Sequence, residues 1–433
     1  MRTRRVLTEN ILALSVLQAL NYAAPLITVP YLVRVLGPAQ FGLLSFAQGI
    51  VLYFDFVTDY GFNFSATRAI SASRDVPEIV SRIFWSTIGA KFALMCASGL
   101  ALSLLVAFTP KLRETSSLFA VNFLYIVGTT FFPIWLFQGL ERLKLAAAFF
   151  GIARLATVPA LFIFVRNPRD YVTAGAIQAS VELIATLFAA PFLFSRLTLK
   201  WSRPSIFDIT GSLKEGWPVF LSGSALFFST SSTTVILGFA AGKTQVGYFS
   251  AADKLVKASI AVLNPIGQAL YPHLTGVKLR SKELALRLIR KSFVIMGTLS
   301  LVASIATFFL ARVLCDIVLG SSFAPSIAVL KWLSPLPLLY GLMNVLGTQT
   351  MLVFEMDKLL TRITLRSAAI ALPLTVFMSM LFGATGAAAA SVALAACIVA
   401  AMVAALRIQG LPVWRNLFAK PIHLVTASSI DQV

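Results

Sequence analysis

The stretch TGAAAASVALAACIVAAMVAAL, residues 385–406, runs for 22 positions without a charged side chain. A helix needs roughly 20 apolar residues to cross the hydrocarbon core of a bilayer, so this stretch predicts a transmembrane helix. Similar apolar windows recur along the chain between charged or Gly/Pro-rich breaks. They predict further helices at 9–33, 42–60, 82–108, 117–138, 146–165, 171–194, 215–239, 248–271, 291–313, 326–353 and 361–381. The predicted fold class is an all-α integral membrane protein with about 12 transmembrane helices.

The composition leaves little room for anything else. The 433 residues are 58% hydrophobic and only 12% charged, whereas about a quarter of the residues in a soluble domain are charged. Cys96, Cys315 and Cys397 each stand alone in an apolar stretch, and the two histidines lie 150 residues apart. These positions favour neither a disulfide framework nor a metal site. The sequence contains no GxSxG, HExxH or Walker motif and its predicted outer loops are short, so we expect neither an enzyme nor a cofactor.

Positively charged residues predict the orientation. Arg2, Arg4 and Arg5 precede a long apolar run without a signal-peptide cleavage site, so the first helix is expected to stay uncleaved. With twelve crossings, the two ends and the even connections hold 24 Lys and Arg residues, against 6 in the odd connections. Cytoplasmic loops carry such an excess, so both termini are expected in the cytoplasm. The same bias, with attraction to anionic lipids at segments 196–214 and 278–291, explains the net charge of +19 without a nucleic-acid partner.

A short internal repeat predicts two halves. Residues 37–47 (GPAQFGLLSFA) and 242–252 (GKTQVGYFSAA) agree at five of eleven positions, with a constant offset of 205. Six predicted helices separate the copies, and this even number implies parallel halves rather than inverted ones. Such halves are expected to enclose a central cavity. The predicted organisation is an N-terminal six-helix bundle at 1–195, a basic cytoplasmic linker at 196–214, a C-terminal six-helix bundle at 215–410 and a cytoplasmic tail at 411–433.

Eight charged side chains fall inside predicted helices, where a central charge costs about 2.5–3.5 kcal/mol. Most are therefore expected to face water or one another. Four are cations from both halves that suit an anion such as a pyrophosphate: Lys91, Arg154, Lys254 and Lys257. Four are acidic, namely Asp55, Asp59, Glu182 and Asp253, and the like-charged pair of Asp55 and Asp59 is a candidate site for a coupling ion.

Simpler interpretations of three of these acidic residues stay open. Asp253 and Lys257 are four residues apart and can form a local ion pair on one helix. Asp55 and Asp59 lie near the inner end of their helix, where water alone can solvate them.

Four stretches resemble one family of membrane proteins. They are PYLVRVLG with FG at 30–37 and 41–42, YGFNFSATR at 60–68, WLFQGLE at 135–141, and GYFSAADK at 247–254, which continues to the Tyr-Pro pair at 271–272. Together they resemble, over nearly the whole chain, the polysaccharide-export flippases of the Wzx type, within the multidrug/oligosaccharidyl-lipid/polysaccharide exporter superfamily. The resemblance implies two six-helix bundles that form a V around a cationic lumen.

The resemblance also implies a function. It implies transfer of an undecaprenyl-diphosphate-linked oligosaccharide across the bacterial inner membrane, for O-antigen or exopolysaccharide synthesis. The four cations would receive the pyrophosphate, and one or more of the four acidic residues would bind a proton or a sodium ion. Membrane lipids and a polysaccharide polymerase machinery are the further partners that it suggests.

Three alternatives are set against this interpretation. A multidrug and toxin extrusion protein carries cationic substrates, which would favour a lumen with surplus carboxylates. A lipid II flippase resembles a pattern of fourteen helices rather than twelve. A membrane-embedded glycosyltransferase or acyltransferase would need a large external loop or a catalytic cluster, and the sequence contains neither.

Overall fold

The computed structural model describes residues 2–196 and 199–411, with side chains from Leu26 on except at 196, 225–226, 229–230, 262–266, 268–269 and 271–273. Every regular element in these ranges is a helix. The elements in chain order are α1 (Arg2–Asp59), α2 (Phe62–Ala72), α3 (Pro77–Phe108), α4 (Pro110–Arg113), α5 (Ser116–Phe131), α6 (Ile134–Gly139), α7 (Leu143–Phe164), η1 (Pro168–Asp170), α8 (Tyr171–Arg196), α9 (Ile206–Ala241), α10 (Lys243–Lys278), α11 (Lys282–Phe309), α12 (Ala311–Leu314), η2 (Cys315–Leu319), η3 (Ser321–Phe323), α13 (Ser326–Leu333), α14 (Leu336–Met343), η4 (Asn344–Leu352) and α15 (Asp357–Ile408).

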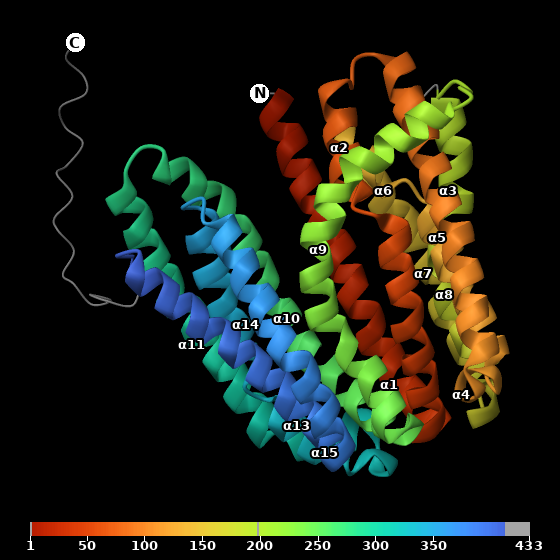
Figure 1. Cartoon of the computed structure of the whole chain (residues 1–433), viewed down its shortest axis with the longest axis vertical. Helices are drawn as coiled ribbons and strands as arrows, with labels where there is room; N and C mark the ends of the chain where they lie inside the picture. Colours follow the sequence, from red (N-terminus) through yellow and green to blue (C-terminus); the bar gives the residue numbers. More distant parts are fainter. Residues whose placement is uncertain (1, 197–198, 412–433) are drawn as a thin grey trace.

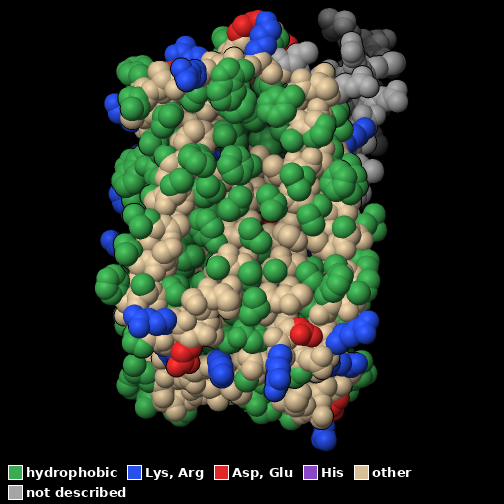
Figure 2. Space-filling view, turned by 90° about the vertical axis from the view of Figure 1, so that its right-hand side faces the viewer, with side chains coloured by type: hydrophobic (Ala, Val, Ile, Leu, Met, Phe, Trp, Pro, Cys, Tyr) green, Lys and Arg blue, Asp and Glu red, His purple; other side chains and the backbone are tan. Residues whose placement is uncertain are grey.

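The described helices are those of a membrane protein. Eight segments among the described residues are long and apolar enough to cross a bilayer, and two of them, Leu26–Ala72 and Asp357–Ile408, are 47 and 52 residues long. Figure 2 shows a broad hydrophobic band on one face, with most of its charged side chains toward the two ends. The predicted all-α membrane fold is confirmed, while the number of about twelve crossings remains a prediction.

Two glycines set the turns where the repeat was predicted. Gly37 bends α1 with φ 70° and ψ 172°, and Gly242 precedes α10 with φ 87° and ψ 173°. Positive φ values are readily adopted only by glycine, so each glycine fixes the point where one long helix gives way to the next. The two positions are 205 residues apart and share one conformation, as the predicted repeat requires.

The two copies of the repeat pack against each other through what we call the glycine seam, formed by Pro38, Gly42, Lys243 and Gly247. A Cβ atom added at Gly42 would lie 1.8 Å from the carbonyl oxygen of Lys243. A Cβ atom added at Gly247 would lie 2.0 Å from the carbonyl oxygen of Pro38. Because Pro38 and Lys243 are equivalent positions of the repeat, the contact is close to two-fold symmetric.

Figure 1 shows two groups of helices, which we call the N-half (α1–α8) and the C-half (α10–α15), with α9 between them. They meet at one end and separate at the other. The closed end contains the glycine seam and a buried core that joins the halves, where Phe41 of α1 clusters with Phe249 of α10 and Phe323 of η3. The open end carries the N-terminus and the even connections, and we call it the basic end.

Helix α9 begins at Ile206, earlier than the predicted helix at 215–239 and inside the predicted linker. Ser205 and Asp208 form a capping box, in which the Asp208 N–H donates to Ser205 Oγ at 3.1 Å. Arg82 of α3 donates to Asp208 Oδ1 at 2.6 Å and ties this helix start to the N-half. Hydrogen bonds from Ser205 and Arg82 lower the pKa of Asp208 to about 2. The domain bounds at 195, 214 and 410 remain predictions, and the predicted tail lies outside the described residues from 412 on.

Stacked aromatic rings line the contact between α1 and α9. The Phe56 and Phe227 ring centroids are 4.4 Å apart, and those of Tyr60 and Phe220 are 4.9 Å apart. Tyr53 adds an edge-on contact to Phe227. These rings hold the middle of α9 against the N-half, and α9 also packs along α15 of the C-half.

Candidate functional site

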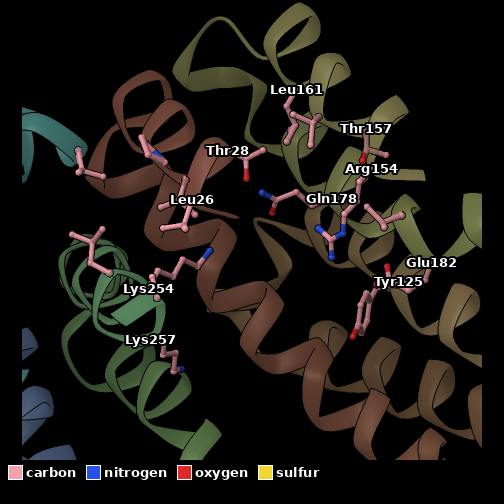
Figure 3. Close-up of a pocket in the computed structure, with 17 residues that line it drawn as sticks. Leu26, Thr28, Tyr125, Arg154, Thr157, Leu161, Gln178, Glu182, Lys254 and Lys257 are labelled. Carbon is pink, nitrogen blue, oxygen red and sulfur yellow. The ribbon is translucent and has the colours of Figure 1, made fainter. Parts of the chain in front are cut away.

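A cavity of about 380 Å³, the central cavity, lies between the two halves. Helices α1, α5, α7 and α8 line it from the N-half, and α10 and η2 line it from the C-half (Figure 3). Its volume is within the range of roughly 300–1,000 Å³ that small-ligand sites occupy. Most of its wall is apolar, so the few charged side chains that reach it decide which ligands it can hold.

Three of the four predicted cations line this cavity: Arg154, Lys254 and Lys257. Figure 3 shows Arg154 on α7 and Lys254 on α10 reaching into the cavity from opposite halves. Lys254 Nζ also lies 5.0 Å from the centre of the Phe41 ring, a cation–π contact that steadies the ammonium group. The structure therefore brings three of the four cations, contributed by both halves, to one cavity.

Lys257 is paired on its own helix. Its Nζ atom lies 2.7 Å from Asp253 Oδ2, which confirms the local ion pair that the four-residue spacing left open. Its side chain remains 64% exposed, so the ammonium group can still meet a ligand. Asp253 itself is not among the residues that line the central cavity.

Lys91 lies elsewhere, in a buried charge cluster of the N-half. Its side chain is 3% exposed, and its Nζ atom lies 3.4 Å from Asp59 Oδ1 and donates to the Thr129 carbonyl at 2.9 Å. Thr129 Oγ1 in turn donates to Asp55 Oδ1 at 2.6 Å. We call Asp55, Asp59, Lys91 and Thr129 the N-half cluster. Its contacts give Lys91 the position of a counter-ion to the two aspartates.

The fourth acidic residue, Glu182 on α8, lines the central cavity together with Tyr125 on α5. Its Oε2 atom is buried and has no hydrogen-bond partner among the described residues. The lining residues thus include three cations and one carboxylate, a formal charge of +2. This surplus favours anions and is the reverse of what a carrier of cationic drugs needs.

Uncharged polar residues that the sequence analysis did not single out extend the site into the N-half. A second cavity, of about 220 Å³, shares Tyr125 and Gln178 with the central cavity. Gln48 Nε2 donates to Gln178 Oε1 at 2.6 Å across it. The sequence marks both glutamines only as amide side chains within apolar stretches. Their spacing in the sequence does not indicate that they contact each other.

Two further cations close the end opposite the basic end. Lys111 donates to the carbonyl oxygens of Gly238 at 2.7 Å and Phe239 at 3.2 Å, which lie near the end of α9. Arg34 donates to the carbonyl oxygen of Ile317 in η2. The offset of 205 maps Arg34 onto Phe239 and Leu112, the neighbour of Lys111, onto Ile317, so these two contacts follow the same pseudo-symmetry as the glycine seam.

Comparison with known proteins identifies the family. The family described as "Polysaccharide biosynthesis protein" matches residues 7–278. This chain belongs to the polysaccharide biosynthesis protein family. Two relatives from this comparison carry the name "Putative O-antigen transporter". The protein of Escherichia coli (strain K12) is 34% identical over 382 residues, 88% of this chain and 92% of the relative. The protein of Shigella dysenteriae is 30% identical over 383 residues, 87% of this chain and 94% of the relative.

Solved structures show which fold this polysaccharide biosynthesis protein has. An inward-facing MATE family multidrug transporter of the MOP superfamily superposes with a TM-score of 0.66 at 14% identity, covering 90% of this chain and 95% of that one. The lipid II flippase MurJ in an inward closed conformation superposes with a TM-score of 0.62 at 14% identity, covering 95% and 90%. At these identities the likeness concerns the fold alone, and it confirms the transporter fold that the resemblance implied.

Proposed function

We propose that this protein moves undecaprenyl-diphosphate-linked oligosaccharide repeat units across the bacterial inner membrane, for O-antigen or exopolysaccharide synthesis. The observation that carries the proposal is the central cavity with Arg154 and Lys254, one from each half, facing each other across it. The family and the name of its relatives point the same way. In this proposal the basic end faces the cytoplasm, so the structure is open to the leaflet where the lipid-linked unit is made.

The charge of the substrate explains the need for these cations. A diphosphate that leaves the headgroup region loses part of its hydration, which costs free energy. The low dielectric constant of the passage raises this cost, and it also strengthens the attraction between the diphosphate and nearby cations, which can compensate for it. Two cations on opposite walls can contact the same diphosphate only while the halves are close together. Substrate binding would therefore favour one arrangement of the halves over the other, which is the condition for alternating access.

The second step requires opening of the opposite end. The contacts that close it are the glycine seam, the hydrogen bonds of Lys111 and Arg34 to carbonyl groups, and the buried core around Phe41. All of them join one helix to another, so the halves can part there without unfolding a helix. We therefore place the exit of the substrate on the side of Gly37 and Gly242.

A coupling ion belongs to the same proposal. The N-half cluster places Asp55 and Asp59 around the single buried ammonium of Lys91. Two carboxylates and one cation leave one negative charge for a proton or a sodium ion to balance. Glu182, with a buried oxygen that lacks a partner among the described residues, is the second candidate. Asp253 is the weakest of the four, because Lys257 already neutralises it.

Complementation tests the proposal. The chain is expressed in a bacterium that lacks its own polysaccharide flippase, and surface polysaccharide is scored against lipid-linked repeat units retained on the inner face. We expect restored polymer with the wild type and loss with Arg154→Ala or Lys254→Ala. A hydrogen bond to a charged group contributes about 1.5–3 kcal/mol, so each variant should lose roughly 10- to 150-fold in affinity for the diphosphate.

Lys331→Ala is the matched control. Lys331 lies on α13 over the Phe308 ring, outside the central cavity. The Lys331→Ala variant therefore removes one positive charge, as the cavity variants do, without changing the site. Full activity of both cavity variants would contradict the proposal. Export of cationic drugs by the wild type, without restored polymer, would support a multidrug exporter instead.

A further inference from the structure

A third cavity, which we call the neutral cavity, lies within the C-half and has a volume of about 340 Å³. Helices α9, α10, α14 and α15 and the π-helix η4 line it, and none of the described side chains in its lining is charged. Its polar side chains are the amide of Asn344, the phenol of Tyr340 and the hydroxyl groups of Ser222, Thr348, Thr361 and Thr364.

The neutral cavity adjoins the central cavity along α10. Lys257 lines the central cavity and Ile260, three residues later on the same helix face, lines the neutral cavity. Tyr340 lies close enough to Lys257 and Asp253 for their charges to act on it. Helix α10 runs from the closed end to the basic end, and Ile260 follows Lys254 and Lys257 along it. The neutral cavity therefore lies nearer to the basic end than these two cations do.

The hydroxyl groups of this cavity are prepared to accept hydrogen bonds. Thr361 Oγ1 donates to the Asp357 carbonyl at 2.9 Å, Thr364 Oγ1 to the Leu360 carbonyl at 3.0 Å, and Ser222 Oγ to the Val219 carbonyl at 3.0 Å. Each hydroxyl has thus used its single donor within its own helix. The lone pairs that remain can accept from the hydroxyl groups of a ligand.

A buried network holds Asn344 in place. Ser292 Oγ donates to Gln349 Oε1 at 2.5 Å, and Gln349 Nε2 donates to Asn344 Oδ1 at 3.0 Å. Gln349 is fully buried, and its five-residue spacing from Asn344 fits the π-helix that carries both. This network fixes the Asn344 oxygen, and Asn344 is one of the residues that line the cavity. π-Helices occur frequently at functional sites, where they orient such side chains.

We propose that the neutral cavity binds the first, uncharged sugar residues of the lipid-linked substrate while the central cavity binds the diphosphate. This inference rests on the proposed function. A sugar offers many hydroxyl groups and apolar C–H faces, and the cavity matches both with its hydroxyl acceptors and with Met343 and Met402. Because the sugar is joined directly to the diphosphate, the site that binds it must adjoin the cations, as this cavity does.

Binding to two lipids tests the inference. The full chain is placed in lipid nanodiscs, and affinities are measured for undecaprenyl diphosphate and for the same lipid bearing a neutral disaccharide. The test variant is Thr361→Val with Thr364→Val, which removes two hydroxyls at constant shape. Each neutral hydrogen bond is worth about a 2- to 12-fold change in affinity. We expect about a 10-fold loss for the glycosylated lipid and none for the sugar-free lipid.

Thr375→Val is the matched control, because Thr375 lies on the same helix, donates to the Ala371 carbonyl at 2.8 Å and does not line the cavity. It should change neither affinity. The inference is overturned if the double variant binds both lipids as the wild type does, or if it weakens both equally. Failure of the proposed function looks different, since the wild type would then bind neither lipid and Lys254→Ala would have no effect.

Discussion

A single methyl group at the glycine seam should open the closed end of the molecule. A Cβ atom at residue 42 would lie 1.8 Å from the Lys243 carbonyl oxygen, whereas ordinary contact begins at 3.4 Å, so the two backbones must separate by about 1.6 Å in Gly42→Ala. The obstacle is backbone rather than a flexible side chain, so it cannot move aside. Overpacking of this kind costs about 1–3 kcal/mol. If that cost falls on the closed arrangement alone, its population relative to the open one drops about 5- to 150-fold.

Labelling of a cysteine inside the central cavity measures this shift. The three native cysteines, at 96, 315 and 397, are replaced by alanine. Ala258, which lines the cavity, is replaced by cysteine. A membrane-impermeant maleimide is then applied to the outer face of spheroplasts. We expect the labelling rate to rise about 5- to 150-fold in Gly42→Ala, in proportion to the open population.

Gly297→Ala in α11 is the control, because an added Cβ atom at Gly297 meets nothing within 4 Å. It should leave the labelling rate unchanged and stabilise its helix by about 0.5–1 kcal/mol. An unchanged rate in Gly42→Ala, with thermal unfolding equal to that of the wild type, would refute the reasoning. So would an equal rise in both variants.

Three further predictions concern single charged contacts. Lys91→Met removes the cation beside Asp55 and Asp59, so we expect a loss of about 3 kcal/mol in unfolding free energy by thermal denaturation; an unchanged midpoint would contradict this, and Asp59→Asn added to Lys91→Met should recover part of the loss. Lys257→Ala should weaken binding of undecaprenyl diphosphate less than Lys254→Ala does, because Asp253 already neutralises Lys257, and equal losses would count against that ranking. Lys111→Met should raise the labelling rate only about 2- to 12-fold, because it removes one partly buried and one exposed hydrogen bond. A rate equal to the wild type would show that this contact does not hold the end closed.

Sequence patterns predicted the fold well, because the length of an apolar segment and the spacing between repeated motifs can both be read directly from the order of residues. The windows that predicted helices fall on described helices, and the repeat at Gly37 and Gly242 recurs as one backbone conformation. The start of α9 was placed too late, although Ser205 and Asp208 already had the spacing of a helix cap.

The candidate site was predictable in part, because depth in the membrane can be counted along a helix whereas the direction of a side chain cannot. Lys91 and Lys254 both fall inside predicted helices, yet Lys91 turns into the N-half and Lys254 into the cavity. Uncharged residues were missed for another reason. Thr361 and Asn344 carry no charge, so nothing in the sequence distinguishes them from the other uncharged polar residues of the helices.

The symmetry of the glycine seam has a consequence for how this molecule can diversify. Gly42 of one half contacts Lys243 of the other, and the equivalent residues Gly247 and Pro38 make the same contact in the opposite direction. This is the geometry of a homodimer whose two subunits are joined into one polypeptide. In a true homodimer every functional residue would occur twice. Here the offset of 205 pairs Lys254 with Gly49 and Asp55 with Ile260, so the scaffold is shared and the chemistry is not. Joining the two copies lets the residues of one half change without altering their counterparts in the other, as our proposal of an ion site in one half and a sugar site in the other requires.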